Sequence, residues 1–355
     1  MVNLTPYLKA MLNHPPTLTA DDMVDALNFI IKGGATDIQI AAFLTALRIT
    51  GIDHSADFIA AAAWRIFQES HKIDKALIKP SGYIDIVGTG GDGKNTFNVS
   101  TTAAIVAAGM GLDICKHGGK ASTSTSGAGD LLPCLGVQTT KVTHLTAPAL
   151  MEESKFCFLF APMFHPIMAS LAPLRKNLGI PTIFNILGPL LNPAPLRSRI
   201  IGVYAENLGR VFAEAVLKMN EHNGVPQSTA LIVWGEEGLD EISPAGRTKV
   251  WQLRDGQITE YYLHPSDFGL STHSLEEVAS GTPQENAAVV HKLVDNKLLE
   301  NDPILDYVVM NAAALAVISD EAANWKEGVE LARKSVSTGR AKEALDKFAA
   351  ATQRL

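Results

Sequence analysis

Two glycine-rich segments, each placed directly after a short apolar run, constrain the fold of this chain more than any other feature. The first follows residues 83–87 and begins Gly-Thr-Gly-Gly-Asp-Gly, and the second fills residues 116–127. Between them, the alanine-rich residues 100–109 predict a helix and residues 112–116 predict a second strand. A strand, a helix and a strand in this order predict a unit of a mostly parallel sheet.

The first 70 residues follow a different pattern, with apolar residues at helical spacing in two stripes. Thr19 and Thr36 stand where a side-chain oxygen can cap a helix start, and Gly33, Gly34 and Gly51 supply stops. This region therefore predicts a helical lobe. Its two stripes are Met23, Leu27, Ile30 and Ile31, and Ile40, Phe43, Leu44 and Leu47.

At 355 residues the chain is too long for one ordinary core, because domains commonly run to about 100–200 residues. The turn-forming cluster at residues 79–82 marks a predicted boundary between a helical domain, 1–79, and an α/β domain. Short β-branched or aromatic runs predict further strands, and two long apolar segments predict helices that cover the sheet. These strands are expected at 156–160, 198–204, 231–234 and 249–252, and the helices at 303–319 and 322–337.

The charge balance argues against several classes of partner. Thirty basic and thirty-seven acidic side chains give a net charge of −7, which repels nucleic acid and anionic membranes, so phosphate binding must be local. The longest apolar run, about residues 103–112, is far shorter than the ~20 residues of a membrane span, and residues 1–12 do not form a secretory signal. Cys115, Cys134 and Cys157 lack the spacings of a zinc site or disulfide framework, so we expect a reduced, cytoplasmic protein.

The first glycine-rich segment, residues 88–93, is typical of a phosphate-binding loop. Glycines let backbone amides approach an anion, and Ser100 or Thr101 adds hydroxyls at a helix start whose dipole favours negative charge. A tight connection without a ligand is the alternative. A dinucleotide site is rejected because its helix would begin inside the motif, and a nucleoside-triphosphatase loop because Asn95 stands where Ser or Thr is needed.

The second segment, residues 116–127, holds two lysines, five hydroxyls and three glycines. Few structural loops need this composition, although a solvated polar loop is the alternative. We expect it beside the first loop at the carboxyl ends of neighbouring strands, where α/β sheets bind ligands. Two such loops suit a ligand with two separated phosphate groups.

Asp240 and Glu241 follow the strand expected at 231–234. Hard carboxylate oxygens on a loop suit Mg²⁺, which proteins often hold together with the phosphates of a substrate. An acidic surface loop that also includes Glu236 and Glu237 explains these residues, taken alone, equally well.

Seven short motifs follow one another along the chain. They are Gly-Thr-Gly-Gly-Asp at 88–92, Asn-Val-Ser-Thr at 98–101, Lys-His-Gly at 116–118, Phe-Ala-Pro with His-Pro at 160–166, Leu-Arg-Lys-Asn-Leu-Gly at 174–179, Phe-Asn-Ile-Leu-Gly-Pro-Leu at 184–190 and Gly-Leu-Asp-Glu at 238–241. In order and spacing they resemble the anthranilate phosphoribosyltransferase family over nearly the full length of the chain.

The resemblance implies an Mg²⁺-dependent pentosyltransferase of tryptophan biosynthesis. The family transfers the 5-phosphoribosyl group of phosphoribosyl pyrophosphate (PRPP) to the amine of anthranilate, giving N-(5-phosphoribosyl)anthranilate and pyrophosphate. Its fold, of the nucleoside phosphorylase and phosphoribosyltransferase type, implies that helices from about 172–195 join the helical domain. Residues 80–171 and 196–355 would then form the PRPP-binding α/β domain, and the helical domain would supply a homodimer interface.

The resemblance also implies roles for individual residues, none of them as an acid or base, because placement of the neutral amine matters more. The implied PRPP contacts are Gly88, Gly91, Asp92, Thr96, Asn98, Ser100, Thr101, Lys116, Gly118, Gly119, Lys120, Ala121, Ser122, Thr123 and Ser124. The implied anthranilate pocket comprises Gly88, His117, Gly119, His165, Arg175 and Pro189, and Mg²⁺ is assigned to Ser100, Asp240 and Glu241. From the residues alone, Arg175 fits either a partner of the anthranilate carboxylate or the solvated face of a helix.

Three features of the sequence depart from the bacterial pattern of the family. Gly119-Lys120 replaces Asn-Arg, Ala128 replaces Ser and Pro181 replaces Arg. The variant residues are similar to the yeast-type, fungal branch, and they leave the orientation of anthranilate open.

Three other functions compete with this one. A pyrimidine-nucleoside phosphorylase would carry a Lys-His-Ser-Thr-Gly-Gly type of loop, which the chain lacks. A relative that binds nucleic acid would show a basic stripe and degraded phosphate loops. Transfer to another aromatic amine stays possible because Gly119 stands where Asn is usual.

Overall fold

A single sheet forms the centre of the molecule. The computed structural model describes residues 3–121, 124–225 and 227–355, and in these residues seven strands pair in the order β3–β2–β1–β4–β5–β6–β7. The strands from β3 to β5 run parallel, whereas β6 and β7 are antiparallel. The predicted α/β class with a mostly parallel sheet and an N-terminal helical domain is confirmed.

Six of the strands overlap the predicted segments. The exception is β7, an edge strand whose residues are mostly exposed or half-buried and which therefore carries a weak apolar signal. The strands are β1 (Tyr83–Gly88), β2 (Ile114–Gly118), β3 (Phe156–Phe160), β4 (Leu196–Gly202), β5 (Thr229–Gly235), β6 (Thr248–Arg254) and β7 (Gln257–Leu263).

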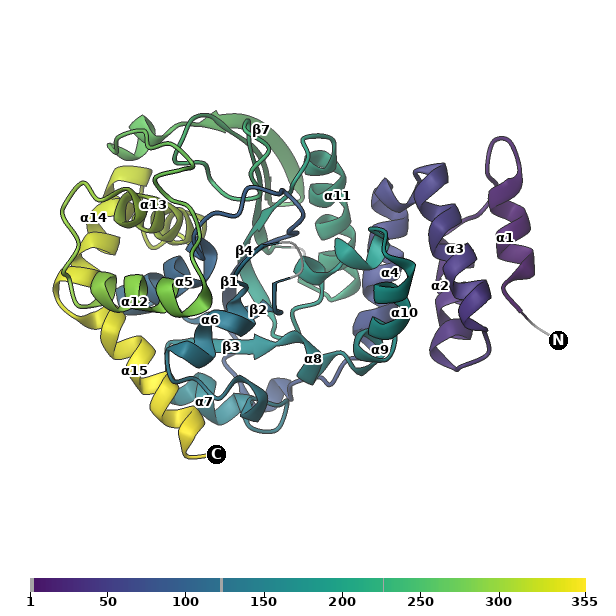
Figure 1. Cartoon of the computed structure of the whole chain (residues 1–355), viewed down its shortest axis with the longest axis horizontal. Helices are drawn as coiled ribbons and strands as arrows, with labels where there is room; N and C mark the ends of the chain where they lie inside the picture. The colour runs from purple at the N-terminus through teal and green to yellow at the C-terminus, as the bar shows by residue number, and fades with distance from the viewer. Residues whose placement is uncertain (1–2, 122–123, 226) are drawn as a thin grey trace.

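One face of the sheet is covered by α5 and the C-terminal helices (Figure 1). Helix α5 is apolar and almost entirely buried, because α13, α14 and α15 pack around it. Helix α14 begins at Trp325, later than predicted, because the Asn324 side chain caps the Glu327 amide. The helices on this side are α5 (Val99–Met110), α6 (Ala128–Cys134), α7 (Ala147–Glu153), α12 (Pro283–Val294), α13 (Pro303–Ile318), α14 (Trp325–Ser337) and α15 (Arg340–Gln353).

The other face of the sheet packs against α11 and, beyond it, the helical bundle at the right of Figure 1. The predicted stripes are buried apart from Ile31, which is half-buried, and Thr19 and Thr36 each form a capping box. Helix α10 packs against α3 and so connects the middle of the chain to this bundle. The helices are α1 (Thr5–Leu12), α2 (Ala20–Ile31), α3 (Asp37–Thr50), α4 (Ala56–Gln68), α8 (Ala161–Phe164), α9 (Pro166–Ser170), α10 (Ala172–Leu178) and α11 (Asn207–His222).

Short 3₁₀ turns connect several of these elements. They are η1 (Ile52–His54), η2 (Lys75–Leu77), η3 (Thr139–Lys141), η4 (Ile183–Asn185), η5 (Gly188–Leu190) and η6 (Pro265–Phe268). None of the helices in the described part of the chain combines the length and the apolar character needed to cross a lipid bilayer.

The strand order reverses between β1 and β4. From β1 the chain continues to β2 and β3 on one side, whereas β4 and β5 lie on the other. At such a switch point the loops after the two strands diverge and leave a crevice at their carboxyl ends. The first glycine-rich segment leaves β1 at this point, and the second leaves the neighbouring β2.

Candidate active site

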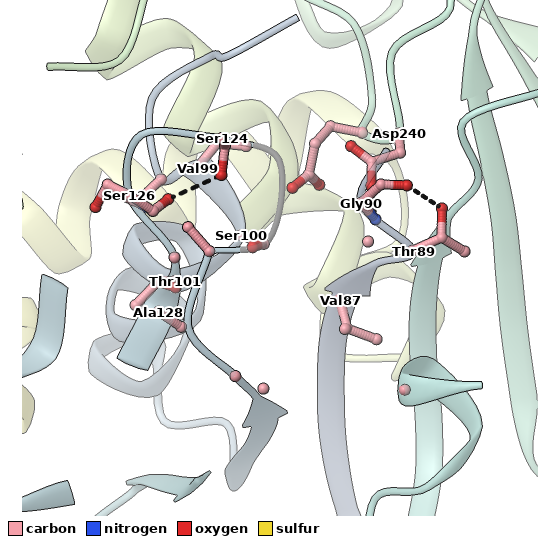
Figure 2. A pocket seen from close by; sticks show the side chains of 18 of the residues that line it. Val87, Thr89, Gly90, Val99, Ser100, Thr101, Ser124, Ser126, Ala128 and Asp240 are labelled. Atoms are coloured by element: carbon pink, nitrogen blue, oxygen red, sulfur yellow. Dashed lines mark hydrogen bonds between the residues drawn. The ribbon is translucent and has the colours of Figure 1, made fainter. Parts of the chain in front are cut away.

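A cavity of about 280 Å³ lies at the switch point. It is lined by both glycine-rich segments, the first turn of α5, a stretch that includes Asn185, Gly188 and Pro189, and the acidic pair Asp240 and Glu241. Figure 2 shows Thr89, Gly90 and Asp240 on one side of it and Ser100, Ser124 and Ser126 on the other. Most predicted site residues meet here. Those in the lining are Gly88, Asp92, Thr96, Asn98, Ser100, Thr101, Lys116, His117, Gly118, Gly119, Lys120, Ala121, Ser124, Pro189, Asp240 and Glu241.

Three predicted residues of the described chain are not part of this lining, and for two more the structure gives no placement. Ser122 and Thr123 lie outside the described residues, and Gly91 belongs to the first loop without lining the cavity. His165 lies behind His117, with 3.0 Å between the two Nε2 atoms, and its Nδ1 is 2.7 Å from the hydroxyl of Ser70. The structure thus makes His165 a buried support for His117.

Arg175 is the third described residue of the prediction that lies outside the lining. It lies on α10, and its guanidinium is 5.7 Å from the centre of the Phe184 ring. Its buried Nε has no hydrogen-bond partner among the described residues. Arg175 therefore lies over the Phe184 ring with one unused donor, and the structure does not bring it into the cavity wall.

The first loop owes its course to glycine. Gly90, Gly91 and Gly93 have φ values of +69°, +86° and +69°, which side chains with a Cβ rarely adopt. A Cβ on Gly88 would lie 2.3 Å from Asp240 Oδ2, so this position must be glycine for the acidic loop to come close. The amide of Gly90 donates a 2.6 Å hydrogen bond to the same carboxylate, which fixes the two loops against each other.

The first turn of α5 also faces the cavity. The Asn98 side chain does not cap this N-terminus, and the Val99 amide donates to the carbonyl of Phe97, so the next amides of the turn stay available to an anion. Asn98, the residue before the helix, ties the two loops together, since its Nδ2 donates to the carbonyl of Ser126 at 2.7 Å. Its Oδ1 accepts a 2.8 Å hydrogen bond from Asn286 on α12. The turn is thereby held rigid at a site suited to phosphate.

Asp240 and Glu241 are buried, each with 8% of its surface exposed. No basic side chain lies within 4.0 Å of either one in the described part of the chain. Burial, together with the charge of Asp92, raises the pKa of Asp240 to about 7. Burial and the charge of Asp240 raise the pKa of Glu241 well above its usual value.

Such a pair fits a divalent cation, because two buried carboxylates with raised pKa values lack the positive charge that would stabilise them. Mg²⁺ accepts hard oxygen ligands of this kind. Among the described residues, no group of three or more His, Cys, Asp or Glu side chains is placed to hold a metal alone. A magnesium ion at Asp240 and Glu241 would therefore take further ligands from a bound phosphate.

Lys116 lies at the base of the cavity and is itself buried. Its Nζ donates to the carbonyl of Ile86 and to the Ser100 hydroxyl, the latter at 3.3 Å. Burial lowers the pKa of Lys116, while the charges of Asp85, Glu241 and Asp240 oppose this shift. A cation and an acidic pair thus face one cavity without forming an ion pair.

His117 forms part of the opposite wall. Burial and the neighbouring His165 lower the pKa of His117 well below its usual value, and burial lowers the pKa of His165 to about 4. Both rings are therefore neutral near pH 7. A neutral wall of this kind suits an aromatic ligand, as the predicted pocket role requires.

Three asparagines are among the residues of the site that sequence reasoning missed. Asn185 and Asn95 line the cavity, and Asn286 supports Asn98 from α12. Asn95 adopts φ +48° and accepts a 2.7 Å hydrogen bond from the Thr125 amide, which links the two loops. Asn185 lies within the motif at 184–190 and could have been found there, whereas nothing local marks Asn286.

Comparison with known proteins identifies the family. Residues 5–66 match the model described as glycosyl transferase family, helical bundle domain, and residues 81–342 match the glycosyl transferase family, a/b domain. Anthranilate phosphoribosyltransferase from Schizosaccharomyces pombe is 46% identical over 338 residues, which cover 95% of this chain and 94% of that protein. The chain belongs to the anthranilate phosphoribosyltransferase family.

Solved structures of this family agree with the assignment. Anthranilate phosphoribosyltransferase from Saccharomyces cerevisiae in complex with PRPP and Mg superposes with a TM-score of 0.92 at 44% identity, covering 99% of this chain and 98% of that one. The same enzyme in complex with 4-fluoroanthranilate gives a TM-score of 0.91 at 41% identity over the same shares. These relatives are fungal, so the predicted likeness to the yeast-type branch is confirmed.

Proposed function

We propose that this chain transfers the 5-phosphoribosyl group from PRPP to the amine of anthranilate, with Mg²⁺ as cofactor, as a step of tryptophan biosynthesis. One observation carries the proposal. Two glycine-rich loops, an uncapped helix start and an unpaired acidic pair line a single cavity at the switch point of the sheet. The family of the chain and the PRPP and Mg of its yeast relative support the same reaction.

In this proposal the two loops hold the phosphate groups of PRPP. Amides of residues 88–93 and the start of α5 bind one end, and residues 116–124 bind the other. Ser100, Asp240 and Glu241 hold Mg²⁺, which when bound supplies positive charge to the leaving pyrophosphate. The near approach of Gly88 and Gly90 to Asp240 supports this arrangement, since it brings a phosphate-binding loop next to the metal ligands.

The reaction breaks the bond between ribose C1 and the pyrophosphate oxygen, and the electron pair leaves with pyrophosphate. Positive charge therefore develops on the ribose, and stabilising the leaving group is the main task. Lys116 faces the cavity and contributes a fixed cation to it. The anthranilate nitrogen forms the new bond to C1 and then loses one proton to solvent.

Anthranilate binds beside His117, Gly119 and Pro189 in this scheme. The low pKa of His117 keeps that ring neutral, which suits a wall for an aromatic acceptor and not a base. His165 acts through His117, and Arg175, on α10, is the cation assigned to the carboxylate. A Cβ on Gly119 would meet no atom within 4 Å, so the acceptor end of the cavity has free space.

The test is the decay of anthranilate fluorescence when the purified protein is mixed with anthranilate, PRPP and Mg²⁺. We expect a decay that starts on PRPP addition and stops with EDTA. Folded protein that binds PRPP without any decay would sink the anthranilate assignment and point to another aromatic amine. Failure to bind PRPP would reject the hypothesis that the protein is a phosphoribosyltransferase.

We also infer a cytoplasmic homodimer, with residues 1–79 and 172–195 as the helical domain and the rest as the α/β domain. The dimer is supported by a second apolar stripe on α3, where Ile38 and Ile49 are 82% and 81% exposed. These residues lie three turns apart on one side of the helix. Leu12 on the neighbouring α1 is 70% exposed. The free cysteines Cys115, Cys134 and Cys157 fit a reducing compartment.

Light scattering tests the dimer directly. The wild-type chain is expected at twice the chain mass, and the Ile38→Lys/Ile49→Lys variant at once the chain mass. Because both side chains are exposed, the variant should keep its helical content by circular dichroism. A monomeric wild type would reject the homodimer.

A further inference from the structure

A second cavity, of about 490 Å³, lies away from the phosphate loops, where the helical bundle meets the α/β domain. It is enclosed by the end of α4, the loop around η2, residues 190–196, β4 and the end of α11. The proposed transfer reaction makes no use of it. Its lining combines apolar side chains with several cations, so its chemistry differs from that of the first cavity.

Arg199 on β4 is the distinctive residue in this wall, and it is 93% buried, with an exposed fraction of 7%. Its Nη2 donates a 2.8 Å hydrogen bond to Asn220 Oδ1, and its Nε has no partner among the described residues. No carboxylate of the described chain lies within the 4.0 Å that defines an ion pair with it. A buried guanidinium with an unused donor is costly unless an anion or water completes it.

The charges around Arg199 favour an anion. Lys72 and Lys75 are exposed at the cavity, and His222 lines it from α11. Asp74 is the acidic member of the lining. Asp85 pairs in register with Arg199 from β1 but does not line the cavity; its charge raises the pKa of Arg199, while burial, the larger effect, lowers it to about 10. The cavity therefore keeps a net positive wall.

The remaining wall is mostly apolar, with the side-chain amides of Gln68, Asn192 and Asn223 as its polar members. Phe67, Ile73, Pro193, Leu196 and Met219 contribute most of it. A guanidinium matches a carboxylate in planar geometry, whereas the apolar side chains suit a hydrocarbon or aromatic body. We infer that this cavity is a binding site for a small carboxylate with an aromatic or aliphatic body, held by Arg199 and distinct from the transfer site.

A short segment separates the two cavities. Gly188 and Pro189 line the first, and Leu190 and Asn192 line the second. The Asn192 amide donates a 2.8 Å hydrogen bond to Asp85 Oδ2, and Asp85 Oδ1 accepts from the His117 amide at 3.3 Å. A molecule bound beside Asn192 would therefore shift Asp85 and, through it, His117 in the wall of the first cavity. Where the proposed function holds, it changes KM for anthranilate and leaves KM for PRPP unchanged.

The experiment titrates 3-phenylpropanoate into the full-length protein by isothermal calorimetry, with PRPP and Mg²⁺ present. We expect a Kd on the order of 1 mM or tighter. Arg199→Met should weaken binding about tenfold or more, because it removes the guanidinium and keeps an apolar side chain of similar length. The matched control is Arg197→Met, two residues earlier on the strand, whose guanidinium pairs with Glu321 at 3.5 Å outside the cavity.

Equal affinity in wild type and Arg199→Met would overturn the inference, since the probe would then occupy the acceptor pocket. Absence of binding to the wild type would overturn it as well. If Arg199→Met does not fold, Lys72→Gln/Lys75→Gln decides, because both lysines are exposed and their loss leaves the core intact. About threefold weaker binding at low salt supports the site, and unchanged binding rejects it. The titration needs no turnover, so it stands apart from the proposed activity.

Discussion

Two buried acidic clusters of the α/β domain differ in whether basic side chains pair with them. Asp306 on α13 accepts from His273 Nε2 at 2.9 Å and from Arg333 Nη2 at 2.6 Å. Asp240 and Glu241 are nearly as buried, yet no basic partner reaches them in the described chain. A paired buried charge contributes to stability once its partners are in place, whereas an unpaired one is kept for a ligand. Lack of a basic partner thus distinguishes Asp240 and Glu241 from Asp306.

The largest effect expected from this contrast is on activity. Asp240→Asn should lower the rate of PRPP-dependent anthranilate consumption about 1,000-fold, because it removes a charged metal ligand whose effect is worth several kcal/mol. The free energy of unfolding should stay the same or rise, since a buried unpaired charge is removed. Glu236→Gln, in the same loop but exposed, serves as the control and should keep full activity. Equal rates in the two variants would contradict the metal assignment.

In the paired cluster around Asp306, substitution should lower the free energy of unfolding. Asp306→Asn leaves Arg333 and His273 without their carboxylate and should lower the free energy of unfolding by about 3 kcal/mol. Urea denaturation measures this loss. Glu343→Gln, which breaks an exposed ion pair with Lys347, should give an unchanged curve. If Asp306→Asn proved as stable as that control, the distinction between the two clusters would fail.

A third effect concerns pH. The pKa of Asp240 is raised to about 7 in the folded chain, so between its unfolded value near 4 and pH 7 the folded state binds more protons than the unfolded state. Stability is therefore greatest at the acidic end and declines as pH rises. Without Mg²⁺ we expect a loss of about 2 kcal/mol between pH 5 and pH 7, and a smaller loss in Asp240→Asn. Identical pH dependence in both proteins would show that Asp240 is not desolvated.

The smallest effect tests the open end of the cavity. A Cβ at position 119 meets no atom of the described residues within 4 Å, so Gly119→Asn should leave the free energy of unfolding unchanged. A new amide near His117 should alter KM for anthranilate by no more than about tenfold, the value of one hydrogen bond. Steady-state kinetics with a saturating concentration of PRPP measure this change. A large loss of stability would mean that the acceptor end is filled by the protein itself.

Sequence reasoning succeeded where a signal is local. The loop at 88–93, the capping threonines and the buried stripes of α2 and α3 depend on neighbouring residues, and the structure has them as predicted. The antiparallel edge was missed because β7 is mostly polar and exposed. Helix α15 gave no clear stripe, since alanines make up four of its seven buried positions.

Parts of the site depend on contacts that no local pattern records. His165 supports His117 from 48 residues away in the sequence, and Asn286 holds Asn98 from 188 residues away. From the residues alone, a surface loop and a metal site explained Asp240 equally well. Only the burial of this side chain in the structure favours the metal site. The roles assigned to Arg175 and His165 stay predictions, because neither side chain reaches the cavity lining.

The hydrogen bond from Gly90 to Asp240 joins residues 150 positions apart. A ribosome adds about 5–20 residues each second, so the phosphate loop is synthesised roughly 8–30 s before the carboxylate that fixes it. During this interval β1 also lacks its neighbour β4 and presents an apolar strand edge. Synthesis of the chain thus includes a period in which its central strand is unprotected, when a chaperone would have most to contribute.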